Sequence, residues 1–281
     1  MQQDTLLTAG SQLTAGRQST TSPQLTANES PDAETVIIDT GCANLSSVRF
    51  AFERLGAKVL VTDDKAKIKA AKRVVLPGVG TAGAAMASLH EKGLVELIQG
   101  LTQPVLGVCL GMQMLAAISK ERGGKGQDCE CLGIIPTDIC ELDTQLLKAE
   151  SLPLPHMGWN QLKLTTNSQG ANSPNVHPLF AGIEDGSYVY FVHSYRAPLS
   201  EFTLAECTYG EGFSAAIGKG NFMGVQFHPE KSAAVGAQIL RNFLQMDELQ
   251  MNKALVNEAL MNEALQSSSA DGQAGAKKAD Q

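Results

Sequence analysis

A cysteine between two glycines is the strongest candidate nucleophile in this 281-residue sequence. In PVLGVCLGMQML (residues 104–115), a strand-like apolar run reaches Cys109 and a helical pattern begins at once. Gly107 and Gly111 flank the cysteine, as a sharp strand-to-helix turn that exposes a nucleophile requires. A thiol at a helix N-terminus is stabilised as the thiolate. The backbone N–H of Leu110 is placed to bind an oxyanion.

A histidine after the last strongly apolar strand is the candidate base. His228 lies in GVQFHPEKS, where Pro229 ends the strand and Glu230 follows two residues after the histidine. A carboxylate there can orient the imidazole and stabilise its charged form, which is the nucleophile–base–orienter arrangement of covalent catalysis. Alone, the His-Pro-Glu sequence is typical of a surface turn. Together with Cys109, it predicts a catalytic set of Cys109, His228 and Glu230.

A second glycine-rich turn is a candidate source of backbone donors. The segment LPGVG follows the apolar run RVVL and places Gly78, Val79 and Gly80 at a strand end. A lone Gly-x-Gly can be only a tight turn, and the fingerprint of dinucleotide-binding loops is absent. Beside Cys109 on a parallel sheet, however, this loop could present further N–H groups to a tetrahedral intermediate.

The other histidines favour structural positions. His90 and His177 are expected on the surface, and His156, beside a proline, in packing or at an interface. His193 is expected to be a hydrogen-bonded structural residue rather than the base, because His228 already fills that role.

Composition excludes several classes of protein. The 22 basic and 29 acidic residues give a net charge of −7, which argues against an electrostatic nucleic-acid binder. No apolar run is long enough to span a membrane, and the first residues do not resemble a secretory signal. Six cysteines are too sparse for a disulfide scaffold and favour a reduced cytoplasm. Neither metal-ligand spacing nor a nucleotide loop is visible, so no metal and no cofactor is predicted.

Alternating apolar runs and helical patterns predict an α/β fold. Strands are expected at 35–39, 58–62, 73–76 and 104–108, and helices near 44–55, 64–71, 83–100 and 110–120. Such alternation implies an open, mostly parallel sheet with helices on both faces. Antiparallel strands added to that sheet are expected at 187–192, 202–209, 213–218 and 221–227, before a closing helix at 232–246. The three motifs fall after strands, where sites of such folds lie.

The two ends differ in composition from the middle. Residues 1–34 are rich in Gln, Ser and Thr and repeat the sequence LTAG, so they are expected to be a disordered leader. Residues 248–281 begin with the five-residue repeat MNKAL, VNEAL, MNEAL, and a helical or disordered tail is expected there. A partner-binding helix is the less favoured alternative for this tail. The globular domain is expected to span 35–247.

In their order and spacing, LPGVG, GVCLGMQ and FHPE resemble the class I glutamine amidotransferase family over residues 36–246. The resemblance implies that Cys109 attacks the side-chain amide of glutamine and forms a glutamyl thioester, which water hydrolyses. His228 would pass the thiol proton to the leaving ammonia, and Glu230 would orient His228. The residues implied to line the oxyanion side or hold the substrate are Gly78, Val79, Gly80, Leu110, Gln113, His193, Ser194 and Tyr195.

Further segments are similar to those family members that serve as glutaminase subunits of imidazole glycerol phosphate synthases in histidine biosynthesis. These segments are DTGCANLSSVRFAFERLGAKV (39–59), PHMGWNQL (155–162) and YFVHSYRA (190–197). The resemblance implies a heterodimer in which ammonia passes to a cyclase subunit that is a (β/α)₈ barrel. Asn44 and Trp159 fit the docking face, Trp159 in a Gly-Trp-Asn turn, although a core position is the commoner fate of a single tryptophan.

Three other functions stay open from the sequence. They are a glutaminase of the same fold for anthranilate, guanylate or pyridoxal phosphate synthesis, a stand-alone hydrolase, and a catalytically silent binding subunit. The 155–162 and 190–197 segments weigh against a different pathway, and the intact triad weighs against a silent subunit.

Overall fold

The computed structural model describes residues 34–246 except 42–44, 122–126 and 166–175. The strands are β1 (Thr35–Ile38), β2 (Val59–Thr62), β3 (Arg73–Gly78), β4 (Val105–Cys109), β5 (Ile118–Ser119), β6 (Cys129–Glu130), β7 (Asp138–Glu141), β8 (His156–Gln161), β9 (Lys163–Leu164), β10 (Tyr188–His193), β11 (Tyr195–Arg196), β12 (Thr203–Tyr209), β13 (Glu211–Lys219) and β14 (Phe222–Val225). The helices are α1 (Leu45–Arg54), α2 (Lys65–Ala70), α3 (Ala82–Glu91), α4 (Val95–Gln99), α5 (Leu110–Met114), α6 (Thr144–Ala149) and α7 (Ala233–Gln245), with 3₁₀ turns η1 (Pro178–Phe180) and η2 (Pro229–Lys231). The tail 248–281, Asn44 and all of the leader 1–34 except Glu34 lie outside the described residues.

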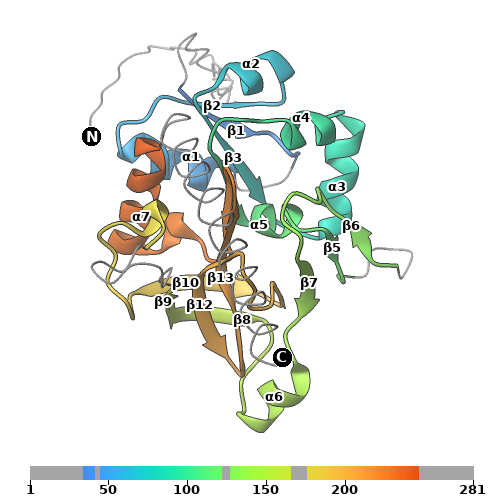
Figure 1. The fold of residues 1–281 in the computed structure, drawn as a ribbon, viewed down its shortest axis with the longest axis vertical. Helices are drawn as coiled ribbons and strands as arrows, with labels where there is room; N and C mark the ends of the chain where they lie inside the picture. The colour runs from blue at the N-terminus through green and yellow to red at the C-terminus, as the bar shows by residue number, and fades with distance from the viewer. Residues whose placement is uncertain (1–33, 42–44, 122–126, 166–175, 247–281) are drawn as a thin grey trace, which may run out of the picture.

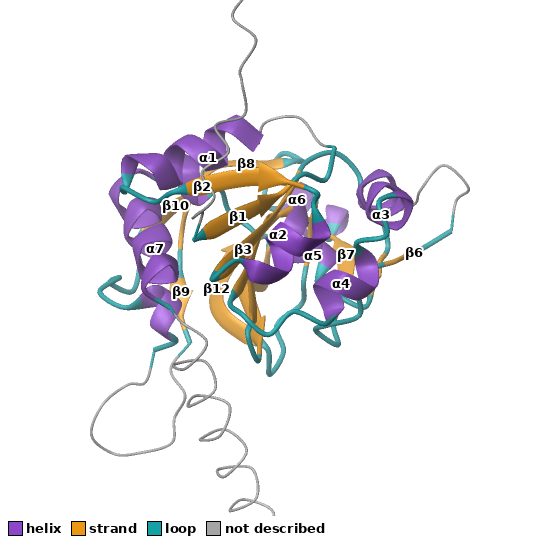
Figure 2. Ribbon diagram, turned by 90° about the horizontal axis from the view of Figure 1, so that it is seen from above, coloured by secondary structure: helices purple, strands orange, loops and turns teal. Residues whose placement is uncertain are grey.

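An eight-stranded mixed sheet in the order β2-β1-β3-β4-β14-β13-β12-β9 runs through the molecule (Figure 1). The first five strands in this order are parallel, and β13, β12 and β9 extend the sheet in antiparallel pairings. Helices α1 and α7 cover one face, and α2, α3, α4 and α5 cover the other (Figure 2). The predicted α/β fold, an open, mostly parallel sheet with helices on both faces, is therefore confirmed.

Both faces of the sheet are packed with apolar side chains. On one face, Phe52 of α1 and Phe243 of α7 meet edge to face with ring centroids 6.2 Å apart, over Ile37 of β1. Val36 and Ile38 of the same strand point into the other core. Burial on both faces explains why the parallel strands read as continuous apolar runs.

The described residues form two smaller sheets besides the large one. A four-stranded sheet has the order β11-β7-β5-β6, and β8 pairs with β10 alone. The prediction that 187–192 joins the main sheet is therefore wrong, since β10 pairs with β8 from Tyr188↔Gln161 to His193↔His156. The expectation that 221–227 is antiparallel holds only for its contact with β13, because β14 lies parallel to β4 on its other side.

Two helices predicted as long are shorter. The segment 83–100 is broken where α3 ends at Glu91, because Gly93 adopts a positive φ of 61° before α4 begins at Val95. The segment 110–120 ends its helix at Met114, and Ala117 N–H then bonds Thr137 O as β5 begins. Apolar runs of this length do not distinguish a buried helix from a buried strand.

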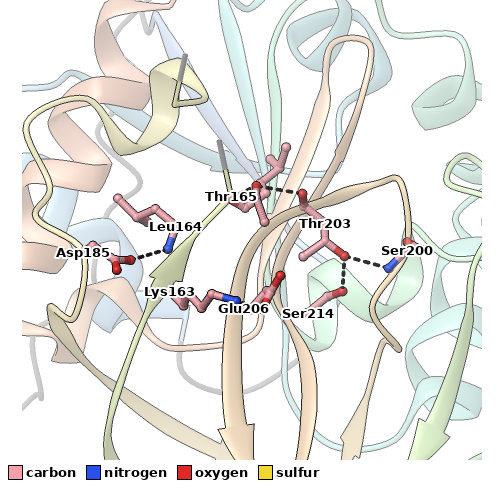
Figure 3. Close-up of polar contacts among 9 residues, drawn as sticks. Lys163, Leu164, Thr165, Asp185, Ser200, Thr203, Glu206 and Ser214 are labelled. Atoms are coloured by element: carbon pink, nitrogen blue, oxygen red, sulfur yellow. Dashed lines mark hydrogen bonds and ion pairs between the residues drawn. The ribbon is translucent and has the colours of Figure 1, made fainter. Parts of the chain in front are cut away.

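The antiparallel end of the sheet is fixed by side chains at its edge strand, β9 (Figure 3). The Leu164 N–H donates to Asp185 Oδ1 at 2.7 Å, so this edge donor is not free to pair with another strand. Thr165 Oγ1 donates to the carbonyls of Thr203 and Leu204 at 3.0 and 2.8 Å. The Thr165 contacts hold the chain just after β9 onto β12, although the two strands share only a short register.

Gly111 lets helix α5 lie directly against β3. A Cβ at position 111 would be 1.8 Å from the carbonyl oxygen of Leu76, so the helix would have to move. We expect Gly111→Ala to lower the free energy of unfolding by about 3 kcal/mol, at the upper end of typical overpacking costs. Denaturant unfolding measures this loss. Gly100→Ala is the matched control, because its Cβ would meet only ordinary contacts from 3.4 Å outward, and an equal effect in both variants would contradict the close approach.

Candidate active site

Three neighbouring parallel strands bring the predicted motifs together. In the sheet, β4 lies between β3 and β14, so the loop at 78–80, Cys109 and the segment 226–230 all follow the same edge. Gly78 pairs with Cys109 in the β3–β4 register. Segments far apart in the sequence therefore meet at the carboxyl ends of the strands, where α/β folds bind their ligands.

Cys109 occupies a strained turn between β4 and α5. Its backbone has φ 54° and ψ −112°, and it is the N-cap residue of α5. Such a conformation costs a non-glycine residue about 1–3 kcal/mol and persists only where the surroundings impose it. Gly107 contributes to this constraint, because a Cβ there would be 2.7 Å from the backbone of Gly111. The strand-to-helix turn that the sequence predicts is present.

His228 and Glu230 form a buried pair behind Cys109. His228 Nδ1 lies 2.8 Å from Glu230 Oε1, and the side chains are only 9% and 2% exposed. Burial alone would lower the pKa of His228, but hydrogen bonds and charge interactions with Cys109 and Glu230 outweigh it and raise that pKa to about 9. Since Nδ1 faces Glu230, Nε2 is the nitrogen left to serve Cys109.

A pocket of about 410 Å³ opens at Cys109, a volume suited to a small metabolite. It is lined by Val79, Gly80, Cys109, Leu110, Gln113, Glu121, Pro155, Val192, His193, Ser194, Tyr195, His228 and Lys231. Nine of these thirteen residues are predicted site residues. A larger hollow of about 790 Å³ lies at the amino ends of β1 and β3, lined among others by Thr35 and Arg73, and it contains none of them.

Two of the eleven predicted catalytic and substrate-binding residues do not line the pocket. Gly78 lies behind it, where a Cβ would be 2.7 Å from the Gly111 backbone nitrogen. Glu230 contacts His228 from behind the pocket, and its Oε2 is buried without a hydrogen-bond partner among the described residues. Trp159, predicted at the docking face, is 51% exposed, so the alternative of a core position is excluded, and it lies within strand β8 rather than in the expected turn.

Three polar residues of the site, Glu121, Lys231 and Gln226, escaped the sequence analysis. Glu121 lines the pocket and accepts a 2.6 Å hydrogen bond from the Ala82 N–H at the start of α3. Gln226 is fully buried; its Oε1 accepts from Gln113 Nε2 at 2.9 Å, and its Nε2 lies 3.9 Å from Cys109 Sγ. Gln226 belongs to the GVQFHPE motif, so position within that motif is the signal that could have found it. Glu121 carries no such signal.

Two further histidines are buried beside the pocket. Burial lowers the pKa of His193 to about 3 and that of His156 to about 4, so both are neutral at neutral pH. The expectation of a structural, hydrogen-bonded His193 agrees with its bond from Nδ1 to the Tyr195 carbonyl at 2.9 Å. His90 is exposed as expected, whereas His177 is half-buried and accepts a hydrogen bond from Leu179 N–H.

The shifted pKa values of His156, His193 and His228 predict that the free energy of unfolding is highest at about pH 6.5. His156 and His193 take up protons in the unfolded chain below about pH 6.5 but not in the folded one, so stability falls as the pH drops toward 4. His228 has the opposite effect. Its contribution to the free energy of unfolding is complete below about pH 6.5 and is lost as the pH rises through about 9.

Denaturant unfolding at about pH 5, 6.5 and 8.5 measures this profile. His228→Asn should flatten its alkaline side. Stability that keeps rising between the second and third values in the unsubstituted chain would contradict the raised pKa of His228.

Membrane-spanning helices, metal-ion sites and disulfide bonds are absent from the described residues. None of the helices in the described ranges is long and apolar enough to cross a membrane. Within the same ranges, no group of three or more His, Cys, Asp or Glu side chains could hold a metal ion. Five cysteines are described and all five are free thiols.

Comparisons with known proteins identify the family of the chain. The family model for "Glutamine amidotransferase class-I" matches residues 36–246. The chain is 79% identical over 218 residues to the "Imidazole glycerol phosphate synthase subunit HisH" of Shewanella oneidensis, covering 76% of this chain and 96% of that protein. It is 48% identical over 212 residues to the HisH subunit of Vibrio cholerae, covering 75% and 98%.

Solved structures share the fold at low sequence identity. A GMP synthase protein from Thermoplasma acidophilum superposes with a TM-score of 0.55 at 15% identity, covering 81% of this chain and 96% of that one. A structure described as a glutamine amidotransferase gives a TM-score of 0.54 at 17% identity, covering 75% and 97%.

Proposed function

Because this chain belongs to the class I glutamine amidotransferase family, we propose that it is the glutaminase subunit of an imidazole glycerol phosphate synthase, with Cys109, His228 and Glu230 as its catalytic residues. The observation that carries the residue roles is that the strained Cys109 turn and His228, which is held by the buried Glu230, line the same pocket. Close relatives named as HisH subunits support the pathway.

The proposed reaction is amide hydrolysis through a thioester. The Cys109 thiolate attacks the Cδ atom of glutamine, and His228 protonates the leaving nitrogen as the C–N bond breaks, which releases ammonia and leaves a glutamyl thioester. Water then attacks the thioester carbonyl with His228 as the base, and glutamate leaves as the C–S bond breaks. Glu230 fixes the Nδ1–H tautomer and stabilises the imidazolium.

Backbone groups at the pocket would stabilise the negative oxygen of the tetrahedral intermediate. The N–H of Leu110 is at the first residue of α5, directly after the nucleophile. Val79 and Gly80 line the same pocket from the loop after β3. Donors aimed at the developing oxyanion usually supply a large share of such catalysis.

Polar side chains of the pocket suit the amino acid head of glutamine. Gln113 Nε2 already donates to Tyr195 O at 3.0 Å and to Gln226 Oε1 at 2.9 Å, so both its amide hydrogens are used and only its oxygen is left to accept from an α-ammonium group. Glu121 supplies a carboxylate for the same ammonium group. The backbone at 193–195, including Ser194, would meet the α-carboxylate from the other side.

The partner is proposed to be the cyclase subunit, which would dock on the face of the β8–β10 pair. Met157, Trp159 and Tyr188 are each more than half exposed on these strands. Tyr190 pairs with Trp159 in the register, and their rings meet edge to face at 5.9 Å. Exposed aromatic clusters of this kind mark protein interfaces. The predicted contact Asn44 lies outside the described residues and stays a prediction.

Trp159→Ala tests this surface. Loss of a central aromatic anchor is expected to weaken binding to the cyclase by about 2 kcal/mol, or roughly thirtyfold, with unchanged folding. Titration calorimetry measures the affinity. Leu199→Ala is the matched control, because Leu199 is also an exposed apolar side chain (47%) but lies outside β8 and β10. Equal affinity for Trp159→Ala and the unsubstituted chain would place the interface elsewhere.

Glutamate release tests the function as a whole. The purified chain is assayed alone and with an imidazole glycerol phosphate synthase cyclase subunit plus its nucleotide substrate. Strong stimulation by the pair supports both chemistry and pathway. Activity that ignores the cyclase would move the chain to another amidotransferase or a free hydrolase, and silence in both assays would favour a binding subunit.

The remaining proposals concern location and domain limits. The five free thiols of the described residues support a reduced, cytoplasmic compartment.

The match over 36–246 supports a glutaminase domain at 35–247, with 1–34 and 248–281 as appendages. Deleting both ends should leave partner binding and turnover unchanged. If the deletion weakens partner binding or turnover, at least one of the two ends takes part in the function.

A further inference from the structure

A buried pair of histidines joins the pocket to the strand that carries the exposed aromatics. His156 of β8 and His193 of β10 are directly opposite in the register, and His156 Nδ1 lies 2.9 Å from His193 Nε2. His193 Nδ1 bonds the Tyr195 carbonyl at 2.9 Å, and Asn160 Nδ2 lies 3.3 Å from His156 Nε2. The side chains of His156 and His193 are almost completely buried, at 2% and 6% exposure.

The hydrogen positions along this series follow from one fixed acceptor. The Tyr195 carbonyl can only accept, so His193 Nδ1 carries a hydrogen, and in the neutral ring Nε2 then accepts. His156 must therefore donate from Nδ1, which leaves its Nε2 to accept from Asn160. Burial keeps both rings neutral by lowering their pKa values to about 3 and about 4. Each ring thus has one tautomer that satisfies all its bonds.

The same carbonyl begins a second series that ends at the nucleophile. Gln113 Nε2 also donates to Tyr195 O, at 3.0 Å, so its amide orientation is fixed. Gln113 Nε2 donates its other hydrogen to Gln226 Oε1 at 2.9 Å. Gln226 must then turn its Nε2 toward Cys109 Sγ, where it lies 3.9 Å from the sulfur. An amide N–H aimed at the sulfur can donate a hydrogen bond to it, whereas the amide oxygen could not.

We propose that these two series form one positioning chain, through which strand β8 sets the alignment of the nucleophile and of the substrate pocket. The chain runs Asn160, His156, His193, the Tyr195 carbonyl, Gln113, Gln226, Cys109. His156 and His193 are positioning residues, and neither exchanges a proton with the substrate. The proposal rests on the glutaminase function proposed above.

The packing around His156 makes the chain stiff and its position dependent on β8. The imidazole lies between the rings of Phe191 and Tyr209, with centroids 4.8 and 3.9 Å away and interplanar angles of 23° and 20°. Met157 and Trp159, its neighbours on the same strand, point to the exposed side. A partner that shifts or clamps β8 through these side chains acts on His156 directly. Cutting a fully paired buried chain leaves its next polar group unpaired, so a single substitution is felt along it.

Substitutions at His156 separate the hydrogen bonds from the packing. His156→Phe keeps a ring between Phe191 and Tyr209 but removes both nitrogens. His156→Asn shortens the side chain but keeps an amide N–H near the position of Nδ1, so donation to His193 can persist. Phe191→Leu is the matched control, because it reduces packing on the same ring without removing any bond of the chain.

The readouts are kcat and KM for glutamine in the complex with the cyclase, and the rate at which iodoacetamide modifies Cys109 in the chain alone. For His156→Phe we expect kcat/KM to fall about tenfold with a raised KM, as for substitutions along coupled networks. Modification of Cys109 should slow several-fold. Affinity for the cyclase should stay within about twofold, and His156→Asn should recover most of both rates.

A folded His156→Phe variant with the kcat, KM and modification rate of the unsubstituted protein would contradict the proposed positioning chain. A His156→Asn variant or a Phe191→Leu control as impaired as His156→Phe would contradict it too. If His156→Phe does not fold, Asn160→Leu cuts the chain at its outer end and should lower both rates in the same direction. If the unsubstituted complex releases no glutamate, the proposed function fails. The Cys109 modification rate of His156→Phe relative to that of the unsubstituted protein still tests the positioning chain.

Discussion

Cys109→Ala is expected to abolish glutamate release by the complex while leaving partner binding unchanged. Among the described residues no other thiol lines the pocket, so without Cys109 the glutamyl thioester cannot form. Removing the nucleophile of a comparable triad costs a factor of about 10⁴ or more in kcat. The surface proposed for docking is on β8 and β10, and it does not include residue 109.

Enzymatic glutamate release and calorimetric binding measure the two halves of this prediction. Cys129→Ala is the matched control, because Cys129 is a free thiol on β6, outside the pocket. It should keep full activity. Glutamate release by Cys109→Ala within tenfold of the unsubstituted chain would remove Cys109 from the mechanism.

His228→Asn is expected to lower kcat by a similar factor, about 10⁴ or more. An asparagine amide can replace Nδ1 in the bond to Glu230, so the buried carboxylate keeps a partner and the fold is retained. The substitution removes Nε2, which is the nitrogen that serves Cys109 and the leaving ammonia. Glu230→Gln should be less damaging, because His228 itself stays in place.

Steady-state kinetics with the cyclase present, and the thermal midpoint of each variant, test this ordering. His90→Asn is the control for loss of an imidazole, since His90 is exposed on α3. A His228→Asn variant that is folded but retains more than about one hundredth of the activity would mean that another group supplies the proton.

The sequence predicted the elements that place the site because their signals are local. The apolar runs before Gly78, Cys109 and Gln226 are buried on both faces, and the glycines around Cys109 mark a close approach of backbone to backbone. Parallel pairing of the three strands then brings the motifs to one edge. The strand order itself follows from the long crossovers between β3, β4 and β14, which sequence patterns do not specify.

What the sequence missed depends on contacts between distant segments. β10 leaves the main sheet because β8 offers it a six-residue register, and nothing within 187–192 distinguishes the two pairings. Trp159 is exposed because β8 alternates between the core and the surface. Glu121 reaches the pocket only because α5 ends at Met114 and the chain turns back through β5.

Labelling with a glutamine analogue that carries a leaving group at the reactive carbon tests the central claim most directly. The chain is incubated with the analogue in the presence of the cyclase, and intact-mass and peptide mass spectrometry locate the adduct. The account predicts one adduct per chain, on Cys109, formed in step with the loss of glutaminase activity and prevented by excess glutamine. An adduct on a different residue, or full glutaminase activity after Cys109 is completely modified, would contradict it.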